Sequence, residues 1–437
     1  MPPRNRRRRL STPPPSEARR PPAPTLSSDI LLEIVARSDA VTLFRFAATC
    51  KPLRRDILNP AFIRRVCHEP GAIVPPRVLG FLDHHIHNEG GEEPRPPVTF
   101  SLAHPATPAA ASFSEKHLAP LLARTGAAQL DGIVVPPASR SGLVFVVRGI
   151  DESSRRYSMA VYDPLAGKLT DFLSAPDINH DYSDRATSTY TYVLLTAADG
   201  IDSSFLIVAA EFPRRSRSVK VQTLSADAAS GGGEWSAAAS VSHCRSRGST
   251  LHKDTAVVVG GVIHWLMEET DPEALRILAY DVRAATAASI ELPTGGLTIR
   301  FSRDIDLAAS PDGRLSLLVA DKLVISVWVL SSGRTGTRGW ERRAVIDAEA
   351  SVRSVMPEVS HSSFKGMVKL ARSWAKSGAV LLQRPVTNMF YLISKSDEEG
   401  LVLVDLETKE MRKVTMKRNA LPYEVDLESR LSAMKIY

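Results

Sequence analysis

The sequence predicts an α+β multidomain fold, with a small all-α module near the N-terminus followed by a large all-β, β-propeller-like domain. Residues 26–69 carry apolar side chains at helical spacing. From about residue 130 onward, short apolar strings alternate with turn residues such as Asp, Pro and Gly. The strand pairs recur about every sixty residues, a spacing typical of a four-stranded propeller blade.

The start signals of short helices mark the predicted all-α module. Ser27 and Ser28 can accept hydrogen bonds from the first backbone amides of a helix, and Asp29 suits the positive end of its dipole. Asn59 followed by Pro60 combines a helix cap with a proline at the first helical position. These signals predict a first helix that begins near Ser28 and a last helix that begins near Pro60.

Two further helices are expected between them, over residues 40–48 and after Cys50. A module of roughly forty residues buries little of its own apolar surface and is marginally stable alone. We therefore expect its remaining apolar face to contact a partner.

A set of mostly apolar residues runs through this module in a defined order: Leu26, Ile30, Leu31, Ile34, Leu43, Phe46, Ala47, Cys50, Lys51, Arg54, Ile57 and Phe62. This order resembles an F-box, the module that docks onto the Skp-type adaptor of cullin-based ubiquitin ligases. The sequence departs from the family pattern at Ser27, where proline is usual, and at Leu53, where tryptophan is frequent.

The resemblance implies a set of apolar side chains that bind the Skp-type adaptor: Leu26, Ile30, Leu31, Ile34, Val35, Leu43, Phe46 and Leu53. The alternative interpretation is an ordinary helical hairpin that packs on the domain behind it.

Composition and charge limit the classes of partner. The chain has 437 residues, of which 43% are hydrophobic, so a large core is possible. Seven arginines and one glutamate among the first twenty residues account for +6 of the net charge of +7. The rest of the chain is almost neutral, which argues against a broad nucleic-acid-binding surface on the folded part.

Residues 1–25 form an Arg/Pro-rich tail that is too polar to order itself, so we expect disorder there. Its run Asn5 to Arg9 could serve nuclear import or touch nucleic acid, or the tail could simply be a solvated segment. The 3 cysteines, Cys50, Cys67 and Cys244, are too scattered for a disulfide framework. With no apolar run of about eighteen residues, we expect no membrane contact and a location in the nucleus, the cytoplasm or both.

Residues 70–437 are expected to form the propeller-like domain. Hairpins with an Asp at the turn are predicted at 158–172, 277–292 and 401–416, where Asp163, Asp281 and Asp405 supply the turn chemistry. Other expected strands are 77–82, 143–148, 205–210, 219–224, 256–266, 315–320, 324–330 and 390–394. The spacing predicts about six blades. An antiparallel sandwich is the structural alternative.

Two short segments in this region, Gly260 to Trp265 and Leu278 to Asp281, resemble the repeat pattern of plant F-box-associated domains, which are propeller-like or kelch-like. The whole order is similar to the F-box families of grasses whose C-terminal domain has no assigned function. In that pattern His264 is a packed strand residue and not a catalytic base.

No catalytic constellation is apparent. Ser362 and Lys365 match Ser-x-x-Lys, a pattern that arises by chance in a long chain, and the Gly231 to Gly233 run is simply a hairpin tip. Asp83 with the histidines at 84, 85 and 87 lacks metal-ligand spacing, so a solvated loop is the expectation. We therefore expect no enzyme activity, no cofactor and no metal.

Together these observations predict a substrate adaptor of a cullin-type ubiquitin ligase. The helices would bind the Skp-type adaptor and through it a cullin, while the propeller would hold an unknown target protein near a ubiquitin-loaded conjugating enzyme. Two alternatives remain: a propeller enzyme or small-ligand binder whose helices cap the ring, and a ligase-independent scaffold or nuclear protein.

Overall fold

The structure is a computed structural model. The residues that it describes are 26–69, 77–83, 99–104, 108–118, 133–151, 156–163, 165–166, 168–172, 178, 188–213, 218–227, 235–242, 250–268, 275–293, 304–310, 312–332, 338–355, 369–373, 379–383, 398–406, 408–417, 421–432 and 434.

Four short helices open the described part of the chain: α1 (Ser28–Ala36), α2 (Ala40–Thr49), α3 (Lys51–Ile57) and α4 (Pro60–His68). Side-chain caps start three of them, because Ser27, Asp39 and Asn59 accept hydrogen bonds from backbone amides of α1, α2 and α4. The start signals predicted from Ser27 and Asn59 are confirmed. We refer to residues 26–69 as the helical module.

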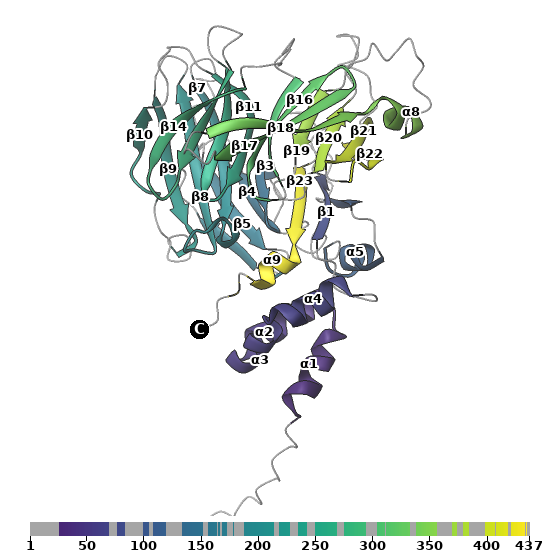
Figure 1. The fold of residues 1–437 in the computed structure, drawn as a ribbon. Coiled ribbons are helices and arrows are strands. Elements are labelled where there is room, and N and C mark those ends of the chain that lie inside the picture. The colour runs from purple at the N-terminus through teal and green to yellow at the C-terminus, as the bar shows by residue number, and fades with distance from the viewer. Residues whose placement is uncertain are drawn as a thin grey trace, which may run out of the picture.

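Five antiparallel four-stranded sheets form the blades of a propeller-like arrangement (Figure 1). The first two contain β3 (Ile133–Arg140), β4 (Leu143–Asp151), β5 (Arg156–Asp163) and β6 (Lys168–Phe172), then β7 (Ser188–Thr196), β8 (Phe205–Pro213), β9 (Ser218–Ser225) and β10 (Ala239–Ser242). The third and fourth contain β11 (Thr250–Val259), β12 (Val262–Glu268), β13 (Leu275–Asp281) and β14 (Thr286–Glu291), then β15 (Ile305–Ala309), β16 (Leu315–Asp321), β17 (Val324–Ser332) and β18 (Arg338–Asp347). The fifth contains β19 (Lys369–Ser373), β20 (Ala379–Gln383), β21 (Glu398–Asp405) and β22 (Met411–Lys417).

The first strands of successive blades lie beside one another, β3 by β7, β7 by β11, β11 by β15 and β15 by β19. These strands therefore line the inside of the ring, and the fourth strands lie outside. Apolar clusters fill the spaces between neighbouring blades: blades one and two, two and three, three and four, and four and five each share one.

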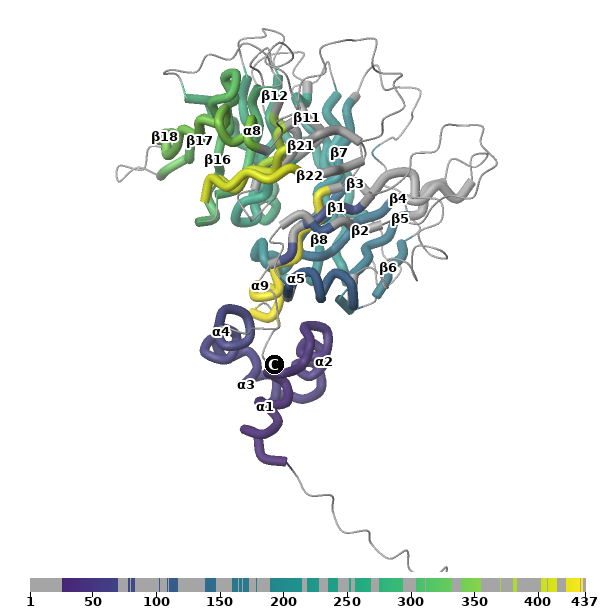
Figure 2. Tube along the Cα trace, turned by 90° about the vertical axis from the view of Figure 1, so that its right-hand side faces the viewer, coloured from purple at the N-terminus to yellow at the C-terminus, as the bar shows by residue number. Residues whose placement is uncertain are grey.

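A three-stranded sheet takes the place next to the first blade. It contains β2 (Thr99–His104), β1 (Arg77–Asp83) and β23 (Leu421–Asp426), in that order, and β23 lies beside β3. The spacing in the sequence predicts about six blades, and the described residues form five four-stranded blades and this smaller sheet. We call it the closing sheet, because it joins a strand near each end of the chain (Figure 2).

Three further helices are relevant below: α5 (Pro108–Phe113), α8 (Glu349–Val355) and α9 (Leu427–Ser432). In both ribbon and tube views α9 lies between the helical module and the ring (Figure 1 and Figure 2). The helical module, α5, α9, the closing sheet and blade one share one apolar cluster.

The predicted hairpins with an Asp at the turn are confirmed. Asp163, Asp281 and Asp405 each end the third strand of a blade, and each accepts backbone amide hydrogen bonds from the turn that follows. The prediction of one strand over 256–266 is wrong. Gly260 and Gly261 have φ angles of 57° and 79°, so the chain turns there and forms the hairpin β11–β12.

Several predictions fall outside the described residues: the disordered Arg/Pro-rich tail, the histidines at 84, 85 and 87, the glycine run 231–233, Cys244, the Ser362/Lys365 pattern and the strand 390–394. Among the helices that the structure describes, none has the length and apolar character needed to cross a membrane.

Candidate docking site

An exposed apolar stripe runs along α1. Ile30 and Ile34 are four residues apart on α1, so they share one face of the helix, and Leu26 lies just before the N-cap Ser27; 53%, 50% and 45% of the surfaces of Leu26, Ile30 and Ile34 are exposed. Elsewhere in the described part of the chain, only Val324 and Val345 are large exposed hydrophobic residues. These three side chains, two on α1 and one just before it, are therefore the largest group of exposed large apolar residues that the structure describes in one segment.

The structure divides the eight predicted adaptor-binding residues into three groups. Leu26, Ile30 and Ile34 are exposed, and Leu31 and Phe46 are half-buried against the shared apolar cluster. Val35, Leu43 and Leu53 are buried, at 1%, 0% and 9% exposure. The buried three hold the helices together, so the surface that a partner could reach consists of the exposed three, with Leu31 and Phe46 beside them.

Polar contacts fix α1 against the other helices. Ser28 Oγ donates a hydrogen bond to Asp56 Oδ2 of α3 at 3.0 Å. Glu33 accepts from Arg65 of α4 and, at 3.0 Å, from Arg37 Nε. The hydrogen bond from Arg65 is the main reason that the pKa of Glu33 lies below its ordinary value. Ile30 and Ile34 remain exposed on α1 beside these contacts.

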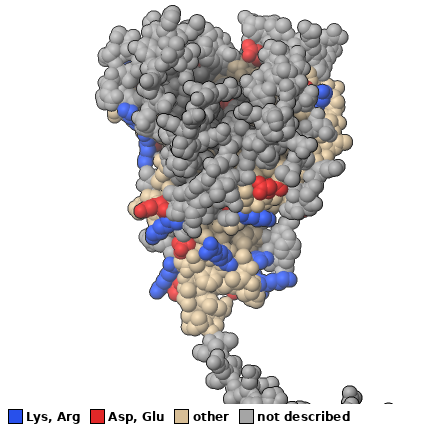
Figure 3. Space-filling model, turned by 180° about the vertical axis from the view of Figure 1, so that it is seen from behind, with Lys and Arg blue, Asp and Glu red and all other residues tan. Residues whose placement is uncertain are grey.

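The surface around the stripe has a definite charge pattern. Seen from behind, Lys and Arg side chains with several Asp and Glu side chains between them lie around the helical module, and the end from which the N-terminal chain leaves shows mainly uncharged surface (Figure 3). An apolar stripe with a charged surround can bind a partner's apolar groove.

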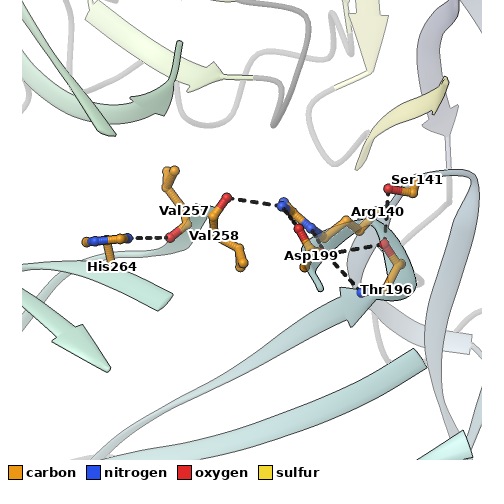
Figure 4. Close-up of polar contacts among 7 residues, drawn as sticks. All are labelled: Arg140, Ser141, Thr196, Asp199, Val257, Val258 and His264. Carbon is orange, nitrogen blue, oxygen red and sulfur yellow. Dashed lines mark hydrogen bonds and ion pairs between the residues drawn. The ribbon is translucent and has the colours of Figure 1, made fainter. Parts of the chain in front are cut away.

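A second candidate site is a buried polar network on the inner side of the ring (Figure 4). Arg140 at the end of β3 forms a two-point ion pair with Asp199, with Nε donating to Oδ2 at 2.7 Å, and its Nη2 also donates to the carbonyl oxygen of Val258 at 3.0 Å. Asp199 accepts from Thr196 N at 2.9 Å, and Thr196 Oγ1 lies 3.2 Å from Ser141 Oγ. Arg140 and Asp199 have only 8% and 3% of their side chains exposed.

This network is structural. Its charged groups bind one another, and Arg140, Asp199 and Val258 belong to blades one, two and three, so the pair joins three consecutive blades. Within the described ranges, no group of three His, Cys, Asp or Glu side chains is arranged to hold a metal ion. His264 on β12 is 6% exposed with its Nδ1 3.3 Å from the carbonyl oxygen of Val257, a packed strand residue as predicted.

The sequence interpretation did not find the Arg140–Asp199 pair. The two residues are 59 positions apart and follow different strands, so no local pattern connects them. The exposure of Ile34 next to the burial of Val35 is also a tertiary property, because both are apolar residues of one helix.

The family comparison covers the strand domain. Residues 103–437 match the domain of unknown function DUF7595. The chain belongs to this family. The match includes all five four-stranded blades, β23 and α9, and it excludes the helical module. A search of curated proteins finds no match.

Among solved structures, the chain is similar to apo prolyl oligopeptidase B from Galerina marginata, with 13% identity and a TM-score of 0.32 over 64% of this chain and 33% of that one. It is also similar to the β-propeller domain of the trilobed protease from Pyrococcus furiosus, with 10% identity and a TM-score of 0.30 over 64% of this chain and 71% of that one. The chain thus spans about a third of the prolyl oligopeptidase it matches. At these TM-scores the likenesses carry no argument about function, and the propeller arrangement rests on the sheet topology alone.

Proposed function

We propose that this DUF7595 protein is a substrate-recognition subunit of a cullin-type ubiquitin ligase. The helical module acts as an F-box that binds a Skp-type adaptor, and the propeller-like domain binds a target protein. The exposed apolar stripe on α1 carries the proposal, because a stripe of three half-exposed large side chains on a small helical module favours a protein partner.

The position of the stripe also supports this function. The helical module projects from one end of the molecule, on the side of α9 away from the blades (Figure 1). A partner on α1 would therefore leave the ring surfaces open for a second protein. Two separate surfaces are what an adaptor between an enzyme complex and its target requires.

The expected loss of adaptor affinity can be estimated from the exposed fraction of the stripe side chains. Complete burial of an Ile or Leu side chain contributes about 1.5–3 kcal/mol, and about half of each stripe residue is still available for burial. Placing a carboxylate there both removes this contribution and desolvates a charge. The double variant Ile30→Asp/Ile34→Asp should therefore weaken adaptor binding by at least ~30-fold.

The experiment is a binding assay between the full chain and a purified Skp-type adaptor, by calorimetry or surface plasmon resonance. Val345→Asp is the matched control, since Val345 is a similarly exposed apolar residue, at 49%, on β18 of the ring. We expect wild type and Val345→Asp to bind alike and the α1 double variant to lose binding. A folded wild-type protein that does not bind the adaptor, or a double variant that binds as wild type does, would contradict the proposal.

Three companion proposals go with this function. The chemistry is supplied by the cullin complex, so the chain itself is not an enzyme and uses no cofactor. The protein acts in the nucleus, the cytoplasm or both, and deletion of residues 1–25 followed by imaging tests whether the arginines direct import. The alternative, a small-ligand binder or enzyme with the helices as a cap, predicts unchanged function after Ile30→Asp/Ile34→Asp.

A further inference from the structure

The last described helix, α9, contributes to the core of the helical module although it lies at the opposite end of the sequence. Leu427 and Leu431 of α9 are fully buried, each at 0% exposure, in the cluster that contains Ile63 and Val66 of α4. The same cluster continues into β1 and blade one. The side of α4 that faces the ring is therefore covered by α9.

Polar contacts extend from α9 in two directions. Toward the helical module, Glu428 Oε2 lies 2.9 Å from His68 Nε2 at the end of α4. Toward the ring, Arg430 donates two hydrogen bonds to Asp163, at 3.1 Å and 2.7 Å. This second pair is largely buried, with 23% and 18% of the two side chains exposed, and its two-point geometry fixes the direction of α9 relative to blade one.

The start of α9 is also fixed by the ring. Asp426 accepts hydrogen bonds from Ser429 N at 2.8 Å and from Ser429 Oγ at 2.6 Å, which caps the helix where β23 ends. Within β23, the carbonyl oxygen of Glu424 accepts from Gly142 N at 2.7 Å, and the Tyr423 hydroxyl donates to the carbonyl oxygen of Gly142 at 3.2 Å. The position of α9 is therefore set by the closing sheet and by blade one together.

We propose that α9 is a positioning element for the helical module: it holds α4, and through α4 the exposed stripe, in one orientation relative to the ring. The role in docking rests on the proposed function, but the positioning of α4 by α9 holds whatever protein binds the stripe. A subunit that must present a bound target at a defined place needs this orientation to be fixed.

Cys67 provides a native reporter of this contact. It lies on α4, is 4% exposed, and belongs to the cluster that α9 completes. Burial, with the nearby charges of Glu428 and Asp426, raises the pKa of the Cys67 thiol to about 12. While α9 is in place the thiol is both covered and protonated, so alkylation by iodoacetamide at pH 8 is slow. Separation of α9 from α4 removes both forms of protection.

The test measures the alkylation rate of Cys67 by mass spectrometry in the full chain with Cys50→Ser and Cys244→Ser, so that only one thiol can react. Arg430→Ala removes the two charge-assisted hydrogen bonds to Asp163, and the rate should rise about tenfold or more. Leu431→Ala should raise it as well. Arg353→Ala is the matched control, because Arg353 pairs with Glu349 on the exposed surface of α8, and the rate should stay at the wild-type level.

The protein used in the test also has its other tryptophans replaced by phenylalanine. Fluorescence of Trp265, which is fully buried in the third blade, then reports the folding of the ring in the same samples. A faster Cys67 reaction with unchanged Trp265 emission supports the positioning role. An unchanged Cys67 rate in both α9 variants would overturn it, and so would a rate increase that always accompanies loss of the ring. Failure of adaptor binding with Cys67 still protected would count against the proposed function alone.

Discussion

Replacing Gly142 by alanine should destabilise the protein more than the same change at an equivalent open turn. Gly142 lies in the β3–β4 turn with a φ angle of 82°, a backbone conformation that residues other than glycine rarely adopt. A Cβ atom there would overlap Cγ2 of Val425 on β23, and Val425 is fully buried. The substitution therefore strains the turn and pushes on the strand that joins the C-terminal part of the chain to the ring.

The loss of unfolding free energy expected for Gly142→Ala has two parts. The left-handed conformation costs a non-glycine residue roughly 1–2 kcal/mol. Overpacking against a buried strand costs about 1–3 kcal/mol more. Gly313 isolates the first part, because its φ angle is 73° and a Cβ atom there would meet nothing within 4 Å. Gly142→Ala should thus lower the free energy of unfolding by ~2–5 kcal/mol and Gly313→Ala by only ~1–2 kcal/mol.

The assay is equilibrium unfolding in urea, followed by far-UV circular dichroism, with the slope of the transition compared among wild type and the two variants. A common slope allows the two free-energy differences to be subtracted. Equal destabilisation by Gly142→Ala and Gly313→Ala would refute the reasoning, because it would mean that β23 does not pack on the β3–β4 turn. Gly142→Ala should also accelerate alkylation of Cys67, whereas Gly313→Ala should not.

Two further predictions concern buried ionisable groups. Arg140→Met leaves the carboxylate of Asp199 buried without its cation and should cost about 3–5 kcal/mol of unfolding free energy. The double variant Arg140→Met/Asp199→Asn should cost clearly less. Equal losses in urea unfolding would show that the pair is not a coupled unit. The pKa of Cys67 is raised from 9.0 to about 12 in the folded protein, so its contribution to stability is complete below pH 9 and is lost as the pH rises toward 12. Cys67→Ala should therefore reduce the loss of stability between pH 9 and pH 11, and an unchanged pH profile would contradict this.

Local features of the fold could be predicted from the sequence because their causes are local. Ser27 and Asn59 cap helices through side chains within three residues of the amides they accept from. Asp163 and Asp281 order their turns in the same way. In each case one side chain forms one or two short-range hydrogen bonds with the backbone, so the residue type at one position is informative.

The failure at 256–266 has a physical reason. Apolar residues continue on both sides of Gly260 and Gly261, and a continuous apolar run is also typical of one long buried strand. The signal that distinguishes the two is the glycine pair itself, because only a two-residue turn needs positive φ angles there.

Contacts between distant segments could not be predicted. The Arg430–Asp163 pair joins residues 267 positions apart, and the His68–Glu428 contact joins residues 360 positions apart. The stripe on α1 was only partly predicted, since periodicity placed Ile34 and Val35 on one face and the packing of the helices exposed the first and buried the second. Which apolar residues remain available to a partner is decided by tertiary packing.

The two connections of the closing sheet explain why docking and ring integrity should be linked. α4 leads through the chain into β1, β1 pairs with β23, and β23 continues directly into α9, which returns to α4. These contacts form a closed path, so a change at Gly142 in blade one can reach α4 through Val425 and α9. The N-terminal cap of α1 at Ser27 is not part of this path of contacts. Hydrogen exchange after Gly142→Ala should therefore increase in α9 and in the ring-facing side of α4 before it increases in the first turn of α1.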